Sequence, residues 1–270
     1  MKVVKIFVAL LGLSASCLGQ GKVSLSLAQI DSLFLKNNLL LLAQEYNINI
    51  QEAYVLQARS YPNPLFSADI NALDPDNEKT FHTGKSGQKA FSIEQLILLG
   101  GKRKTEIELA KQNKHVAELE LEDLLRNLQY QLHTSYYTIN GQINTLNKYS
   151  RQLELLDTLI SSFEIQSKRG NIPAKDVIRL KSVYFKINND KSSLAGDYFN
   201  EEQKIQLLLQ ISDYIIPKVN ERDFDLLTAL KEYDELVSTA LEMRPDLKQA
   251  SQLEALALLN LKYQKKLAIP

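Results

Sequence analysis

Three histidines are the residues of this sequence best suited to metal binding or acid–base chemistry. His115 and His133 lie five helical turns apart in one predicted helix, which places them on the same face but about 27 Å apart. His82 stands alone in a polar segment. No serine-hydrolase, phosphate-loop or dinucleotide-binding signature accompanies them. We therefore expect a protein that is not an enzyme, with no catalytic, metal or cofactor-binding residues.

A basic run follows two glycines, where Gly100 and Gly101 precede Lys102-Arg-Lys104. The glycines permit a sharp turn and are interpreted as a structural joint rather than as a phosphate cradle. Cations at the start of a helix oppose its dipole. Two explanations stay open for them: an ordinary solvated surface, or attraction to lipid headgroups.

The N-terminus, residues 1–19, has the layout of an export signal. A charged start is followed by the apolar run Ile6–Leu13 and then by small residues, and we expect cleavage after Gly19. Acylation at Cys17 is the alternative, because the residues before it loosely resemble a lipoprotein signal. Cys17 is the only cysteine, so the mature chain is predicted to lack a disulfide framework.

The charge balance argues against a nucleic-acid partner, since 32 Lys and Arg residues match 32 Asp and Glu residues. With charged residues at 24% and only 10 glycines, the composition is typical of an ordered helical protein. Beyond the signal, no run of about 18 apolar residues suggests a transmembrane helix. Any membrane crossing would therefore have to use strands.

A β-hairpin is predicted after the first helix, which we expect over residues 26–59. Asn63 and Pro64 mark the structural turn before a strand at 65–73. Apolar residues from Phe66 to Ala72 alternate with polar residues in this strand, and a second strand is expected at 90–98. The alternative is a soluble hairpin packed on the helices. In the membrane interpretation, the lipid-facing strand residues are Phe66, Ala68, Ile70, Phe91 and Ile93.

Two long helices follow the hairpin. The first, from Lys102 to about residue 168, would extend about 100 Å, and its apolar residues repeat at the three- and four-residue steps of a coiled coil. A return helix is expected over 174–211, an irregular insert over 215–226, and helix again from about 230. The joint between the long helices is predicted to have a left-handed Gly170 and a helix-capping Asn171; it comprises Arg169, Gly170, Asn171, Ile172 and Pro173.

The end of the sequence echoes its start. Leu35 and Leu241, like Pro64 and Pro270, are separated by the same 206 residues. A period of this length predicts a duplicated half rather than a solenoid. We therefore divide the chain into a first structural repeat at 20–229 and the start of a second at 230–270.

These features together resemble the TolC family of outer-membrane efflux channels, and the Gly-Gly-Lys-Arg form after the second strand is similar to its CzcC-like branch. The resemblance implies a mainly α fold of long antiparallel coiled-coil helices with one β-hairpin, half of a TolC-like α-barrel and β-barrel. It also implies a homotrimer in outer-membrane lipid that spans the periplasm. Such a channel is passive and works with a periplasmic adaptor, at the joint 169–173, and an inner-membrane pump.

The resemblance covers one half of the family's pattern and ends at Pro270, where a second hairpin is expected. We therefore expect an incomplete chain, which carries none of the gating residues of the second half. The exported substrate stays open between metal cations and drugs. The alternatives from other classes are a periplasmic coiled-coil adaptor and a structural helical-hairpin protein.

Overall fold

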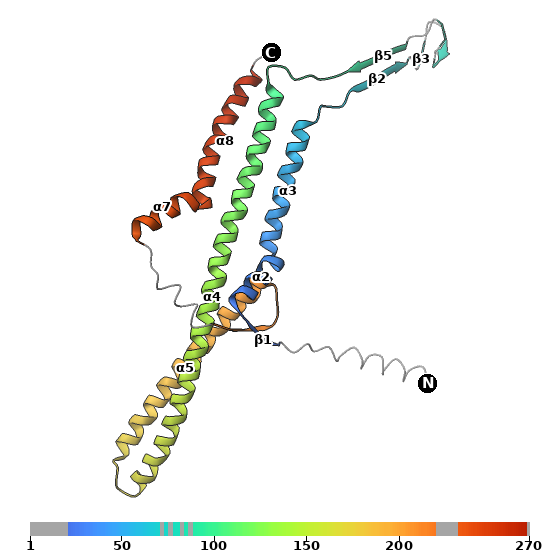
Figure 1. Cartoon of the computed structure of the whole chain (residues 1–270). Coiled ribbons are helices and arrows are strands. Elements are labelled where there is room, and N and C mark those ends of the chain that lie inside the picture. The colour runs from blue at the N-terminus through green and yellow to red at the C-terminus, as the bar shows by residue number, and fades with distance from the viewer. Residues whose placement is uncertain are drawn as a thin grey trace, which may run out of the picture. The chain divides into compact units, whose positions relative to one another are not determined.

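The computed structural model describes residues 21–70, 73–74, 78–81, 84–85, 89–219 and 232–268 (Figure 1). The predicted export signal, Cys17, His82 and Pro270 lie outside the described residues. The described elements are, in chain order, β1 (Lys22–Leu25), α2 (Leu27–Asn37), α3 (Leu39–Arg59), β2 (Leu65–Ile70), β3 (Leu73–Asp74), β4 (Lys79–Thr80), β5 (Lys89–Glu94), α4 (Lys102–Lys168), α5 (Ala174–Leu209), β6 (Tyr214–Pro217), α7 (Tyr233–Met243) and α8 (Pro245–Leu267).

The chain forms two compact units. The turn unit consists of residues 1–41 and 124–236, and the hairpin unit of residues 42–123 and 237–270. Helix α4 contributes its first part to the hairpin unit and its second part to the turn unit.

Helix α4 has the predicted bounds and runs without a break for 67 residues. No proline interrupts it, and several of its hydroxyl side chains donate to carbonyls of the preceding turn. Thr145 donates to the carbonyl of Gly141 at 2.9 Å, and Ser150 donates to the carbonyl of Leu146 at 2.9 Å. Serine and threonine hydroxyls can compete with the backbone hydrogen bonds of a helix. Here these hydroxyls bond to the preceding turn and leave the backbone bonds of the helix in place.

The prediction of a single opening helix over 26–59 is wrong, because the helix is interrupted at Asn38, which separates α2 from α3. Asn38 has the extended backbone φ −68°, ψ 117°. Its side-chain oxygen accepts from the amides of Leu40 at 3.0 Å and Leu41 at 3.1 Å. Its Nδ2 donates to the carbonyl of Leu208 on α5 at 3.0 Å. Asn38 thus caps α3 and also links the α2–α3 junction to α5 through a hydrogen bond.

The same helix–break–helix arrangement recurs 206 residues later. Helix α2 and helix α7 each contain 11 residues, and α3 and α8 begin one residue after an extended residue. In the second copy that residue is Arg244, with φ −66°, ψ 118°. The backbone therefore repeats at the offset predicted from the sequence, whereas the division into repeats at 20–229 and 230–270 stays a prediction.

The turn unit contains a parallel strand pair where the sequence predicted an irregular insert. Strand β6 pairs with β1, so that Val23 faces Ile215 and Leu25 faces Pro217. The Tyr136 hydroxyl donates to the carbonyl of Leu25 at 3.2 Å. The fully buried side chains of this unit come from α2, α4, α5 and β6 and include Ile30, Phe34, Leu132, Tyr136, Ile139, Ile205, Leu209 and Ile215.

The hairpin is present, and its second strand ends earlier than predicted, whereas residues 71–72 of the first predicted strand lie outside the described residues. Strands β2 and β5 pair antiparallel from Leu65 opposite Glu94 to Ile70 opposite Lys89. Beyond Glu94, the Gln95 side chain donates to the carbonyl of Pro62 at 2.8 Å. The backbone ladder ends at Glu94, and residues 95–98 are not strand. Strands β3 and β4 form a separate two-residue pair.

Candidate functional site

The apolar face of the hairpin is the first candidate site. Phe66 lies opposite Ile93, and Ala68 lies opposite Phe91. The Phe66 and Phe91 rings stack diagonally with centroids 6.3 Å apart. Since directly opposed residues share a face of the ladder, these side chains form one apolar stripe, with Ile70 at its end. All of them are exposed, Ile93 to 73%.

The opposite face of the hairpin is polar. Ser67 lies opposite Ser92, and their hydroxyls are hydrogen-bonded at 2.7 Å. One face is therefore mainly apolar and the other mainly polar, although Lys89 lies opposite Ile70 on the apolar face and Leu65 lies on the polar face. Contact of the apolar face with lipid stays a prediction.

The base of the hairpin contains the predicted structural turns. Helix α3 ends at Arg59, and Asn63 and Pro64 lead without helical structure into β2. On the other side, Gly100 and Gly101 both have left-handed backbones, with φ 70° and 73°. A β-carbon added at Gly101 would also lie 3.0 Å from Nζ of Lys266. Both glycines are therefore needed for the strand-to-helix joint.

Arg103 fixes α4 to the chain that enters the hairpin. Its guanidinium lies over the Tyr61 ring, 3.8 Å from the centroid, and donates to the carbonyl of Arg59. An open cavity of about 420 Å³ lies here, lined by residues of both segments, including Asn63 and Leu98. Cation–π stacking of this kind favours arginine over lysine.

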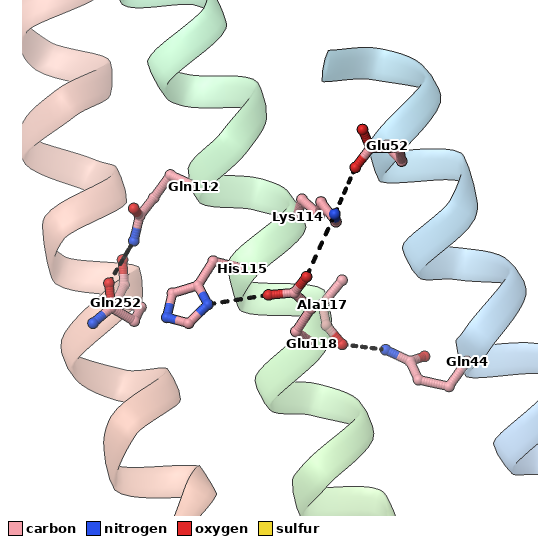
Figure 2. Close-up of polar contacts among 8 residues, drawn as sticks. All are labelled: Gln44, Glu52, Gln112, Lys114, His115, Ala117, Glu118 and Gln252. Atoms are coloured by element: carbon pink, nitrogen blue, oxygen red, sulfur yellow. Dashed lines mark hydrogen bonds and ion pairs between the residues drawn. The ribbon is translucent and has the colours of Figure 1, made fainter. Parts of the chain in front are cut away.

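A layer of amide and charged side chains surrounds α4 in the hairpin unit (Figure 2). Gln112 donates to Gln252 of α8 at 2.6 Å. Lys114 pairs with Glu52 of α3 at 2.5 Å, and this hydrogen bond lowers the pKa of Glu52 and raises the pKa of Lys114. Such polar partners lack the regular spacing of apolar positions, so the sequence analysis missed them.

Glu120 receives side chains from both neighbouring helices. Gln44 of α3 donates to Oε2 at 3.1 Å and Gln249 of α8 donates to Oε1 at 3.3 Å. Gln44 also donates to the carbonyl of Ala117 at 3.2 Å (Figure 2). One carboxylate on α4 thus positions both helices of the hairpin unit that flank it.

A buried carboxylate lies in the turn unit, at a position that no sequence pattern indicates. Glu202 of α5 is 0% exposed. It accepts from the Tyr198 hydroxyl at 2.8 Å and from the amide of Ile215 in β6 at 3.2 Å. Burial raises the pKa of Glu202, against the opposing effect of these two hydrogen bonds. Glu202 therefore joins β6 to α5.

The joint between the long helices has the predicted left-handed residue, Gly170, with φ 78°. The prediction that Asn171 caps the next helix is wrong, because its side chain donates to Gln166 of the preceding helix at 2.7 Å. Pro173 is the N-cap of α5 and makes no side-chain cap bond. Arg169 and Ile172 complete the turn, and contact of residues 169–173 with an adaptor stays a prediction.

The described histidines make separate contacts. His133 lies 2.7 Å from Asp31 of α2, and His115 lies 3.3 Å from Glu118. Over the residues that the structure describes, no group of three His, Cys, Asp or Glu side chains is arranged to hold a metal ion. Within the same residues, no helix has the length and apolar character needed to cross a membrane.

No protein-family model and no curated protein matches the sequence. Solved structures match its fold. CusC, whose structures concern folding and transmembrane channel formation, gives a TM-score of 0.69 at 18% identity, over 87% of this chain and 55% of that one. The outer membrane protein VceC from Vibrio cholerae gives 0.65 at 12%, over 88% and 58%. The CmeC outer membrane channel from Campylobacter jejuni gives 0.63 at 16%, over 89% and 52%.

The chain therefore spans about half the length of the solved structures that it matches. The predicted fold is confirmed: the chain has the fold of TolC-type outer-membrane channels over most of its length, with long antiparallel helices and one hairpin.

Proposed function

We propose that this protein is the outer-membrane channel component of a tripartite efflux system. It would allow passive export of small molecules or metal cations from the periplasm. The observation that carries the proposal is the hairpin, whose apolar stripe of Phe66, Ala68, Phe91 and Ile93 is exposed on one face only. A two-stranded hairpin of this kind is marginal in water and needs a further partner. Lipid is a partner that suits one apolar face, in a chain with the fold of membrane channels.

The assembly proposed is a homotrimer in outer-membrane lipid, reached after export through the predicted signal at residues 1–19. Neighbouring chains would cover the apolar side chains that α3 and α5 expose, such as Ile50, Tyr54, Phe185 and Leu207. Exposed apolar side chains that lie together on a protein surface are typical of association surfaces.

The partners proposed are a periplasmic adaptor and an inner-membrane pump, with the turn 169–173 as the adaptor contact. The support for this is that the turn lies at the far end of the α4–α5 pair and is fixed by the left-handed Gly170. Glu164 and Lys181, paired at 2.6 Å, join the two helices near that turn. An exposed turn with a defined backbone conformation suits a docking contact, because little order has to be gained on binding.

Two other functions, a soluble periplasmic adaptor and a structural helical hairpin, are distinguished by membrane extraction. The proposal expects the protein, as cells produce it, to sediment with outer membranes and to resist extraction by alkaline carbonate. Deletion of its gene should raise the cellular accumulation of a fluorescent efflux substrate. Release of the protein into the soluble fraction would favour an adaptor or a scaffold and would contradict the channel.

A further inference from the structure

An unusual apolar segment lies between the hairpin and α4. Leu96, Ile97, Leu98 and Leu99 are consecutive, and their side chains are 61%, 63%, 37% and 71% exposed. Tyr61, on the chain that enters the hairpin, is 61% exposed as well. An exposed run of four large apolar residues is costly in water and marks a surface that another phase or partner covers.

Cations gather directly beside this segment. Lys102 and Lys104 begin α4, which has no acidic residue in its first turn. Their placement is unfavourable for the helix itself, because the N-terminus of a helix carries a partial positive charge. Arg59 at the end of α3 is exposed. Lys265 joins the group from α8, whose Lys266 donates to the carbonyl of Gly101 at 3.2 Å. We call the exposed cations Arg59, Lys104 and Lys265 the basic collar.

Three further cations, Arg103, Lys266 and Lys262, make contacts within the protein. Arg103 stacks on Tyr61 and donates to the carbonyl of Arg59. Lys266 donates to Gly101 and, at 2.7 Å, to Oγ1 of Thr105. Lys262 lies 3.7 Å from Glu108. Arg103 and Lys266 thus hold the joint, and the exposed cations of the collar are placed around it.

We propose that the hairpin base binds anionic phospholipid. The run Leu96–Leu99 enters the acyl region, Tyr61 lies at the boundary of that region, and the basic collar binds the phosphates of the headgroups. Apolar side chains next to cations match the boundary between acyl chains and anionic headgroups, where tyrosine is also favoured. The inference rests on the proposed function, because it requires the hairpin to lie in a membrane. It deepens that function by naming the lipid class that fixes the depth of insertion.

The test compares association of the full chain with two kinds of vesicle: phosphatidylcholine alone, and phosphatidylcholine mixed with phosphatidylglycerol. The chain should prefer the mixed vesicles. Each lysine or arginine near an anionic surface contributes about fivefold to the partition coefficient. The triple variant R59Q/K104Q/K265Q should therefore lose about a hundredfold of this preference. The matched control K148Q/K175Q/K186Q removes three exposed lysines of α4 and α5 and should keep it.

A folding defect is detected by the helical circular dichroism of each variant. If the triple variant does not fold, K104Q alone, at an exposed position, should show about a fivefold loss of preference. Inorganic phosphate in excess should not reduce the preference more than chloride at the same ionic strength. A specific reduction by phosphate would mean a site for the free anion and would overturn the lipid proposal.

The remaining outcomes separate the two proposals. Equal association of the chain with both kinds of vesicle would overturn the lipid site and leave the membrane hairpin intact. An equal loss of preference in the control variant would also overturn it, because the effect would then follow from net charge. Failure to associate with either vesicle would contradict the proposed function, and the lipid site with it.

Discussion

Asn38 and Arg244, 206 residues apart, hold the same backbone conformation. The φ and ψ angles are −68° and 117° at Asn38, and −66° and 118° at Arg244. Each separates an 11-residue helix from a longer one. The side chains that support the two breaks differ. Asn38 caps α3 directly, whereas Arg244 makes no side-chain cap bond and instead pairs with Asp246.

The first prediction follows from this difference. Asn38→Ala removes two cap bonds and the bond to Leu208, and should lower the free energy of unfolding by about 1–2 kcal/mol. Asn38→Ser keeps an acceptor at the cap without placing a charge against the carbonyl of Leu208, and should cost less. Arg244→Ala removes only a surface ion pair and should lower the free energy of unfolding much less than Asn38→Ala does. Urea unfolding followed by circular dichroism measures the free energy of unfolding of all three variants. Equal losses of this free energy in the two alanine variants would contradict the stabilising role of the Asn38 cap.

The second prediction concerns pH. The folded pKa of Glu202 is raised above the ordinary value of 4.5, so the folded protein holds this proton more tightly than the unfolded chain. Its contribution to stability is therefore fully present below pH 4.5 and is lost as the pH rises through the folded pKa. In Glu202→Gln that loss is absent. The melting temperature of the natural protein relative to this variant should fall with rising pH, and a pH-independent difference would refute the effect.

The third prediction concerns the apolar stripe. Phe91→Arg places a charge on the face proposed to contact lipid, and should cost about 2–4 kcal/mol of membrane-inserted stability if the site lies near mid-bilayer. Ser92→Arg, one residue along, places the same charge on the polar face and should cost much less. The amount of heat-resistant, membrane-assembled protein is the readout. Similar losses in both variants would mean that the stripe does not face lipid.

The fourth prediction concerns the helical turn. Gly170 has a positive φ, which a β-branched residue adopts only with strain, so Gly170→Val should disturb the turn and weaken efflux while the oligomer persists. Gly170→Asn is the matched control, since asparagine tolerates this conformation. Cross-linking to the adaptor should fall in the valine variant alone. Normal cross-linking and efflux in that variant would remove residues 169–173 from the proposed contact.

Long-range periodicity made much of this fold predictable. Helix α4 had the predicted bounds because no proline or glycine cluster interrupts it, and the left-handed Gly170 followed from the residues around it. The break at Asn38 was missed because the apolar period continues across it, and a single asparagine side chain satisfies the exposed amides. Strand β6 was missed because its partner β1 lies about 190 residues earlier, as in the pair Lys22 and Tyr214, and pairing at that distance leaves no local pattern.

The candidate sites also differ in how far they could be predicted from the sequence. The apolar stripe was predicted residue by residue, because a strand alternates with a period of two. The carboxylates Glu120 and Glu202 and the stacking of Arg103 on Tyr61 could not be predicted. Their roles depend on side chains from other elements, and charged residues at such positions look like ordinary surface in the sequence.

The most direct test of the membrane hairpin uses the absence of tryptophan from the sequence. Phe91→Trp and Ser92→Trp each introduce one fluorophore, on opposite faces of the same strand. In bilayers that contain phospholipids brominated on their acyl chains, the account predicts strong quenching of the tryptophan at position 91 and weak quenching at position 92. Equal quenching at the two positions, or no quenching at 91, would contradict it.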